Sequence, residues 1–257
     1  MKNLLKKKWS GGEPTLGAWL TMPSSVAAEM MSRLGFDWLT IDLQHGLIGY
    51  SDAVRMLQAM SASDTVPLAR VPWNEPGIIG KVLDAGAQGV VIPMVNTRTE
   101  AEAAVAACRY RPEGQRSFGP MRAALVHGSG YYDAANREIC CMPMIETEEA
   151  VSNLDEILAV GGIDAVFVGP ADLSVSLGLD PLKGPETERF AEAFDAILAG
   201  CARHGIVVGC AGTALTAPKR IGQGVLFVEV SRDSASMIRA AGKDLRGIRD
   251  LLAEKKE

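Results

Sequence analysis

Two acidic residues and one arginine stand at the ends of short apolar runs in this sequence. Glu146 directly follows one run, Asp172 comes shortly after another, and Arg70 ends a third. Packing does not explain a carboxylate just after a buried strand. Hard divalent cations such as Mg²⁺ and Mn²⁺ do explain it, because they prefer oxygen ligands and leave their other positions to water and substrate. We therefore expect Glu146 and Asp172 to bind a metal.

Other residues with reactive side chains also follow apolar runs in this sequence. A loop containing Asp42, Gln44 and His45 follows another apolar run. Arg70 could donate charge-assisted hydrogen bonds to an oxygen that becomes negative during a reaction. Pro170 fits the first position of a helix, where free N–H groups bind anions, so a small carboxylate could lie on the Ala171 and Asp172 amides.

The scaffold must bring the ends of several separate strands together. Short apolar runs alternate with helical segments along the chain, and no G-x-G-x-x-G motif follows the first run. This pattern favours a (β/α)₈ TIM barrel, with residues 1–257 as a single domain, over an open doubly wound sheet. In such a barrel the active site lies at the carboxyl ends of the strands. The expected strands are 16–20, 38–42, 66–70, 89–93, 140–145, 165–168, 207–209 and 226–230.

Local signals predict several helix boundaries. Ser24 or Ser25 should begin a helix that stops before Gly35, Asn74 should cap another, and residues 97–100 match a capping box. Residues 110–137 look irregular, and an insertion of that length is usually functional. The lysines at 6–8 are expected to be a solvated terminus.

The last expected helix starts at Asp233 and runs toward Leu252. It carries apolar residues at helical spacing that would pack either on its own barrel or against another subunit. These residues are Met237, Ile238, Ala241, Leu245 and Ile248.

Composition excludes several classes of protein. The chain has 257 residues, of which 47% are hydrophobic and 22% charged, and its net charge is −5. That acidic balance argues against nucleic-acid and anionic-membrane partners. No apolar stretch approaches the roughly 20 residues that span a bilayer, and no signal peptide opens the chain. The five cysteines lack CxxC spacing, so we expect reduced, mostly buried thiols in a cytoplasmic protein.

The distribution of lysines constrains the chemistry. A Schiff-base aldolase in this fold needs a buried lysine on a barrel strand, and none of the expected strands contains one. Carbonyl chemistry here should therefore depend on a metal. Cys210 follows the seventh expected strand without a neighbouring base, so it is interpreted as part of a pocket wall.

Six segments together resemble the HpcH/HpaI aldolase family of class II, metal-dependent pyruvate aldolases, which includes 4-hydroxy-2-oxoheptanedioate and 2-dehydro-3-deoxyglucarate aldolases. The resemblance covers essentially the whole chain in order. It implies a (β/α)₈ barrel, a hexamer of two trimers, and Mg²⁺, Mn²⁺ or Co²⁺ as cofactor. The segments are GFDWLTIDLQHG (35–46), PLARVPWNEP (67–76), LDAGAQGVVIPMVNT (83–97), RYRPEGQRSFGP (109–120), MIETEEAV (144–151) and FVGPADLSVSLG (167–178).

The resemblance also implies roles for individual residues. Glu146 and Asp172 would bind the metal, and Arg70 would contact the pyruvate carbonyl oxygen and stabilise its enolate. His45 would belong to the base system with Asp84 as its acidic partner. Asp84 lies late in its helix, at the end of its own barrel opposite to His45, so such a pair should form across a subunit interface. Asp42 would lie near the developing hydroxyl of the aldehyde.

Three departures from the family pattern bear on the substrate. Many members have Glu where this chain has Gln44, which changes the charge beside His45. Many have Gln where this chain has Met144, which removes a polar group near the metal. Residues 116–120 also differ from the usual R-G-x-G-S. The metal pair and Arg70 are intact.

The sequence thus predicts a carbon–carbon lyase that cleaves or forms 4-hydroxy-2-oxo acids through a metal-stabilised pyruvate enolate, releasing an aldehyde. Oxaloacetate decarboxylation or CoA-ester lysis would use the same enolate, although the acidic balance disfavours a CoA site. A non-catalytic barrel that binds a keto acid is the remaining alternative. The identities of the aldehyde and the metal stay open.

Overall fold

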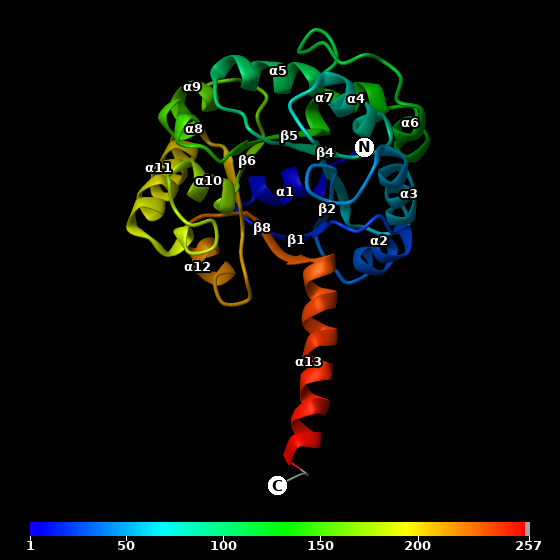
Figure 1. Ribbon diagram of the computed structural model, residues 1–257. Coiled ribbons are helices and arrows are strands. Elements are labelled where there is room, and N and C mark those ends of the chain that lie inside the picture. Colours follow the sequence, from blue (N-terminus) through cyan, green and yellow to red (C-terminus); the bar gives the residue numbers. More distant parts are fainter. Residues whose placement is uncertain (255–257) are drawn as a thin grey trace.

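The computed structural model describes residues 1–254 and contains eight parallel strands closed into a barrel (Figure 1). Each strand pairs with the next in chain order, and the last pairs with the first. The predicted (β/α)₈ barrel is confirmed, and every expected strand overlaps an observed one. The strands are β1 Thr15–Leu20, β2 Trp38–Asp42, β3 Val66–Arg70, β4 Gly89–Ile92, β5 Cys140–Ile145, β6 Ala165–Val168, β7 Val207–Ala211 and β8 Phe227–Arg232.

Helices surround the barrel in the alternating order that parallel strands require. No helix among the described residues is long and apolar enough to cross a membrane. The helices are α1 Leu4–Ser10, α2 Ser25–Ser32, α3 Tyr50–Met60, α4 Pro76–Asp84, α5 Arg98–Cys108, α6 Met121–His127, α7 Tyr131–Glu138, α8 Glu148–Ser152, α9 Leu154–Leu158, α10 Pro170–Ser176, the 3₁₀ helix η1 Gly184–Glu186, α11 Glu188–His204, α12 Ala217–Gly222 and α13 Asp233–Glu254.

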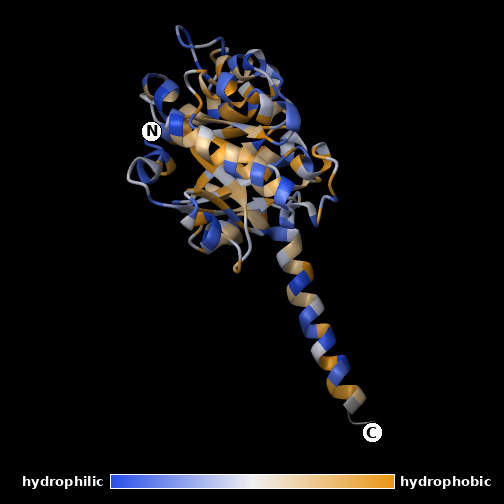
Figure 2. Ribbon diagram, turned by 90° about the vertical axis from the view of Figure 1, so that its left-hand side faces the viewer, coloured by the Kyte–Doolittle hydropathy of each residue, from blue (hydrophilic) through white to orange (hydrophobic). Residues whose placement is uncertain are grey.

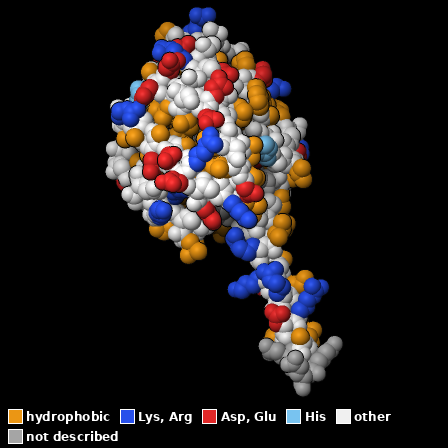
Figure 3. All heavy atoms as spheres, turned by 60° about the vertical axis from the view of Figure 1, so that its left-hand side comes forward, with side chains coloured by type: hydrophobic (Ala, Val, Ile, Leu, Met, Phe, Trp, Pro, Cys, Tyr) orange, Lys and Arg blue, Asp and Glu red, His pale blue; other side chains and the backbone are white. Residues whose placement is uncertain are grey.

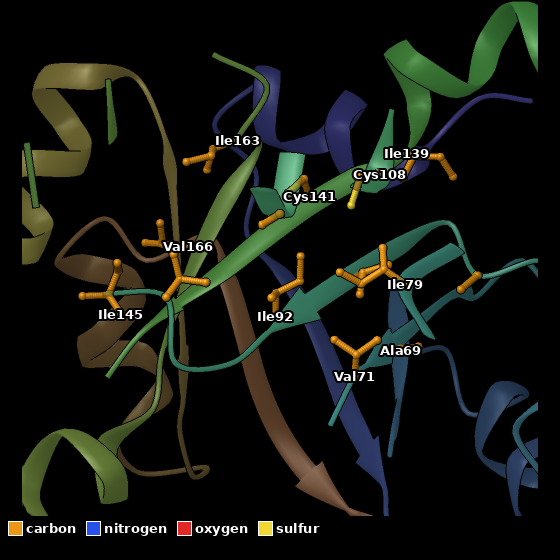
Figure 4. Close-up of a cluster of buried hydrophobic side chains, with 14 of the residues drawn as sticks. Ala69, Val71, Ile79, Ile92, Cys108, Ile139, Cys141, Ile145, Ile163 and Val166 are labelled. Carbon is orange, nitrogen blue, oxygen red and sulfur yellow. The ribbon is translucent and has the colours of Figure 1, made fainter. Parts of the chain in front are cut away.

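The strands are buried on both faces, as expected for a parallel barrel. On β5, Met142 and Met144 belong to the cluster inside the barrel, whereas Cys141 and Ile145 belong to the larger cluster under the helices. Figure 4 shows part of the outer cluster, including Cys141 beside Cys108. The five cysteines are free and buried, in agreement with the prediction of reduced thiols.

The N-terminal segment differs from the prediction of a solvated terminus. It forms α1, whose N-cap is Asn3, and it buries Leu5 and Trp9 against the inner cluster of the barrel. The Lys6 ammonium lies 2.6 Å from an Asp164 carboxylate oxygen. Leu5 and Trp9 are four residues apart, so they lie on one face of this short helix, and that face packs against the barrel.

The expected irregular insertion is also wrong in part, because residues 110–137 contain α6 and most of α7. Buried Arg116 links this segment to α4 and holds its parts together. Its side chain is fully buried, donates to Asp84 at 2.6 Å and to the Tyr131 hydroxyl at 3.0 Å, and lies over the Tyr110 ring.

The cap predictions have mixed outcomes. Thr97 and Glu100 form the predicted capping box at the start of α5, and Ser24 caps α2. Asn74 does not cap α4. Glu75 does so by accepting from Gly77 and Ile78 N–H, while the Asn74 amide donates to the Glu100 carbonyl.

The C-terminal helix α13 projects away from the barrel (Figures 1 and 2). Asp233 anchors its first turn by accepting from Thr21 N–H, the Thr21 hydroxyl and Met22 N–H. Beyond that anchor the apolar side chains are exposed, with Ile238 at 69% and Ile248 at 59%. The alternative in which this helix packs on its own barrel is therefore wrong for the described residues.

Candidate active site

A cavity of about 450 Å³ opens at the carboxyl ends of the strands. Its wall combines apolar side chains from inside the barrel with polar groups from the strand ends. The predicted residues Asp42, His45, Arg70, Ala171 and Asp172 line it. The remaining lining residues are Trp19, Thr21, Met22, Leu47, Met144, Phe167, Gly169, Pro170, Ala211, Glu229, Arg232 and Ser234.

Arg70 is held rigidly at the floor of the cavity. Its Nε and Nη2 donate to the two carboxylate oxygens of Asp42 at 2.8 and 2.6 Å, and its guanidinium carbon lies 4.2 Å from the centre of the Trp19 ring. Burial alone would raise the pKa of Asp42, but the hydrogen bonds and charge of Arg70 outweigh it and hold that pKa below its ordinary value. Such a clamped cation suits recognition of a developing oxyanion.

Asp42 has little capacity left for a substrate. One of its oxygens also accepts from the backbone N–H groups of Gln44 and His45, at 3.1 and 3.2 Å. Both oxygens are thus engaged within the chain. This geometry supports a role in positioning Arg70 and the His45 loop, in addition to the role near the aldehyde that the resemblance implies.

Glu146 is a buried carboxylate with one free oxygen. Its Oε1 accepts from the Met94 N–H at 2.8 Å, whereas its Oε2 has no hydrogen-bond partner among the described residues. Burial, joined by the charge of nearby Asp172, raises the pKa of Glu146 to about 7 despite the Met94 hydrogen bond and the Arg70 charge. A buried carboxylate oxygen without a partner is costly, so a bound cation would remove a real energetic penalty.

These residues fit a divalent cation that completes its coordination from outside the protein. A Cβ atom on Gly169 would lie 2.4 Å from Glu146 Oε2, so only glycine lets the backbone approach this carboxylate so closely. Within residues 1–254 no cluster of three or more metal-ligating side chains occurs. Two hard oxygen ligands, Glu146 and Asp172, match a site that relies on substrate and water for the rest.

The first turn of α10 faces the same cavity. Gly169 is its N-cap without a side-chain bond, Pro170 is its first residue, and Ala171 and Asp172 are exposed. No hydrogen bond from the Ala171 or Asp172 N–H appears in the part of the chain that the structure describes. The predicted anion contacts at these two amides remain a prediction.

The structure separates Asp84 from His45. The exposed His45 lines the catalytic cavity, whereas Asp84 ends α4 and binds Arg116 beside a different cavity. The two residues are not brought together within one chain. This arrangement agrees with the expectation that any pairing would be between subunits.

Trp19, Glu229 and Arg232 are lining residues with polar or aromatic side chains that sequence reasoning missed. Trp19 on β1 supports Arg70, and on β8 Glu229 accepts from Arg232 at 3.1 Å. The signal that could have revealed Glu229 is its charge inside an apolar run, FVEV, where packing calls for apolar residues.

Barrel topology, a clamped arginine and two carboxylates that follow strand ends together match the arrangement expected of a (β/α)₈ enzyme. Comparison with known proteins gives the family. The model of the HpcH/HpaI aldolase/citrate lyase family matches residues 15–240, and the chain belongs to that family.

Two relatives of this chain are named as aldolases, which are carbon–carbon lyases. The hydroxypyruvate/pyruvate aldolase of Rhizorhabdus wittichii is 40% identical over 253 residues, covering 97% of this chain and 100% of the relative. The 4-hydroxy-2-oxo-heptane-1,7-dioate aldolase of Salmonella dublin is 40% identical over 247 residues, covering 94% and 92%. The crystal structure of a family protein from Burkholderia cenocepacia J2315 superimposes with a TM-score of 0.89 at 32% identity, covering 96% of this chain and 100% of that one.

Proposed function

We propose that this chain is a divalent-metal-dependent aldolase that cleaves or forms 4-hydroxy-2-oxo acids, with pyruvate and an aldehyde as the products of cleavage. The observation that carries the proposal is Oε2 of Glu146, which is buried and has no hydrogen-bond partner among the described residues. The charges of Asp172 and Arg70 both act on the pKa of this carboxylate. The names of the two aldolase relatives support the same reaction class.

Glu146 and Asp172 would hold Mg²⁺, Mn²⁺ or Co²⁺. When bound, the cation acts as a Lewis acid that withdraws electrons from the oxygens of a 2-oxo acid. The Ala171 and Asp172 amides would bind the substrate carboxylate. Met144 and Phe167 provide an apolar wall beside these groups, which strengthens the electrostatic interactions within the cavity.

Arg70 would stabilise the electrons released from the breaking carbon–carbon bond. Asp42 occupies its Nε and Nη2, and no hydrogen bond from Nη1 occurs within residues 1–254. That nitrogen can donate to the 2-oxo oxygen as its negative charge develops. Because Asp42 and Trp19 fix the guanidinium beforehand, little reorganisation is needed during the reaction.

His45 would accept the proton of the 4-hydroxyl group, directly or through a water. As the proton leaves, the oxygen forms the aldehyde carbonyl, the bond between C3 and C4 breaks, and its electrons form the pyruvate enolate. Protonation at C3 then gives pyruvate. Asp84 of a neighbouring subunit would orient the His45 ring.

This scheme requires an assembly, and we place it in a homohexamer of two trimers by family resemblance. The exposed apolar side chains of α13 support association (Figure 3). The buried free cysteines support a reducing, cytoplasmic environment.

The test is a screen of pyruvate release from several 4-hydroxy-2-oxo acids, with oxaloacetate decarboxylation measured in parallel. We expect release that stops after chelation and returns with Mg²⁺, Mn²⁺ or Co²⁺. Pyruvate release that survives complete metal removal would contradict the metal-dependent mechanism. Decarboxylation alone, without cleavage of any 4-hydroxy-2-oxo acid, would contradict the aldolase assignment.

A further inference from the structure

Glu229 places an additional carboxylate inside the catalytic cavity. On β8, Phe227 belongs to the apolar cluster inside the barrel, and Val228 belongs to the cluster under the helices. Glu229 therefore points inward again, one layer above Phe227, and it lines the cavity. Its neighbour on β1 in the pairing register is Gly17, which contributes no side chain there.

An irregularity in the sheet fixes this position. Gly17 pairs with Glu229, but the next residue of β1, Ala18, pairs with Ser231, so Val230 is an extra residue in β8. A bulge of this kind bends the strand and redirects the side chains around it, and bulges occur often beside active sites. Here it lies between the two cavity residues Glu229 and Arg232.

The surroundings of Glu229 leave one of its oxygens available. Its side chain is only 8% exposed, and Oε1 accepts from Arg232 at 3.1 Å. No hydrogen bond to Oε2 occurs within residues 1–254, yet this atom is not sealed off from solvent. Nearby cavity walls are apolar, formed by Trp19, Phe167 and Ala211, so a substrate group is the natural partner for this oxygen.

Charge decides which substrate group fits. Glu229 offsets the charge of Arg232, whose side chain is 49% exposed, so this wall does not present an uncompensated cation to a distal carboxylate. A carboxylate oxygen accepts hydrogen bonds and repels a second carboxylate. A neutral hydroxyl group can donate to it. Burial also raises the pKa of Glu229, although Arg232 and Arg70 act in the opposite direction.

We propose that Glu229 determines specificity by accepting a hydrogen bond from a hydroxyl group on the substrate's carbon chain. The enzyme would then prefer a hydroxylated substrate to one with a distal carboxylate. This inference rests on the proposed aldolase function and adds its substrate class. The hydroxyl could belong to the aldehyde or to C3 of the 2-oxo acid, and the experiment distinguishes these two sources.

The experiment measures kcat/KM for aldol addition with matched substrates. Pyruvate is combined with glycolaldehyde, propanal or succinic semialdehyde, which end in a hydroxyl, a methyl and a carboxylate. In a second arm, hydroxypyruvate replaces pyruvate with propanal as the acceptor. The variants are Glu229→Leu, which removes the acceptor, and Glu229→Gln, which keeps an acceptor oxygen without the charge. Glu192→Leu, at an exposed position of α11 outside the cavity lining, is the matched control for the loss of a carboxylate.

We expect the wild type to favour the hydroxylated member of one arm, and that arm identifies the source of the hydroxyl. Glu229→Leu should lower kcat/KM for that member by roughly 10- to 100-fold, as the loss of a hydrogen bond to a charged group predicts. The reaction of pyruvate with propanal should change little. Glu229→Gln should keep much of the preference but accept succinic semialdehyde better, and Glu192→Leu should behave as wild type.

Two results would overturn the inference. One is an active Glu229→Leu enzyme that keeps the wild-type preference for the hydroxylated substrate. The other is an equal loss with every substrate in a folded Glu229→Gln enzyme, which would assign Glu229 to the structure or to the chemical step. Failure of the proposed function looks different, because the wild type itself would then add pyruvate to none of the aldehydes.

Discussion

At the scale of single residues, Glu146 and Asp172 are the side chains that we propose bind the metal. We predict that Glu146→Gln and Asp172→Asn each abolish pyruvate release and weaken Mn²⁺ binding measured by calorimetry. Circular dichroism should show an intact barrel, since neither side chain belongs to the apolar clusters. Full activity in a metal-stripped double variant would end the metal hypothesis.

The environment of Glu146 predicts a dependence of stability on pH. Its pKa is raised from 4.5 to about 7 in the folded state, so between these values the folded protein binds a proton that the unfolded chain has lost. The contribution of Glu146 to stability is thus complete below about pH 4.5 and is lost as the pH rises through about 7. Glutamine resembles the protonated form and keeps an acceptor for Met94.

In metal-free protein, Glu146→Gln should therefore raise the melting temperature at pH 8 and change it little at pH 5. Thermal melts of both proteins after chelation check this. Adding Mn²⁺ should stabilise only the wild type strongly. An equal difference between the two proteins at both pH values would show that the pKa of Glu146 is not raised.

Arg70 and His45 should separate enolate formation from aldol chemistry. Arg70→Ala should cripple both aldol cleavage and oxaloacetate decarboxylation, since both pass through the enolate, and loss of one oxyanion donor costs about 10²–10³ in rate. His45→Ala should cripple cleavage while sparing much of the decarboxylation, which needs no base for a 4-hydroxyl group. Parallel assays of each variant provide the comparison, and a misfolded protein would lose both activities. Equal losses in well-folded His45→Ala would instead assign His45 to positioning substrate or water.

At the scale of elements, α13 is a helix whose apolar side chains remain exposed after the chain has folded. Asp233 ties its base to the loop after β1, beside the cavity, but the exposed side chains of Ile238, Leu245 and Ile248 have no cover from the barrel. We predict that Ile238→Asp with Leu245→Asp lowers the molar mass measured by light scattering at micromolar concentration. Lys243→Asp on the same helix is the control for added negative charge. A wild-type protein that is already monomeric at that concentration would count against assembly.

At the scale of the whole molecule, the separation of Asp84 from His45 predicts a site shared between subunits. His45→Ala and Asp84→Asn should each be weakly active alone. Subunits of the two variants that are dissociated, mixed and reassembled should regain activity, because some interfaces then combine an intact His45 with an intact Asp84. Mixtures that stay as inactive as their parents would indicate that Asp84 serves Arg116 and the fold instead of the reaction.

The sequence by itself determined the barrel and several of the polar residues around its cavity, including Asp42, Arg70 and Asp172. Short apolar strands alternating with helices leave few topologies, and a right-handed parallel barrel is the one that closes over eight repeats. Arg70 and Glu146 could be placed because a residue at a strand's carboxyl end lies on the catalytic face of such a barrel. The Thr97 capping box could be placed because its hydrogen bonds are local.

Only the tertiary structure decided which residues inside the strands and helices meet. Strands that are apolar on both faces do not reveal which side chains point inward, so Glu229 was hidden within its run and the bulge at Val230 was unforeseen. Arg116 and Asp84 are 32 residues apart, and nothing local predicts their contact.

The same amphipathic pattern in α13 suits packing on its own barrel or on another subunit. The direction in which the helix leaves β8 excludes packing on its own barrel for the described residues, and this direction depends on the anchor of Asp233 at the distant Thr21.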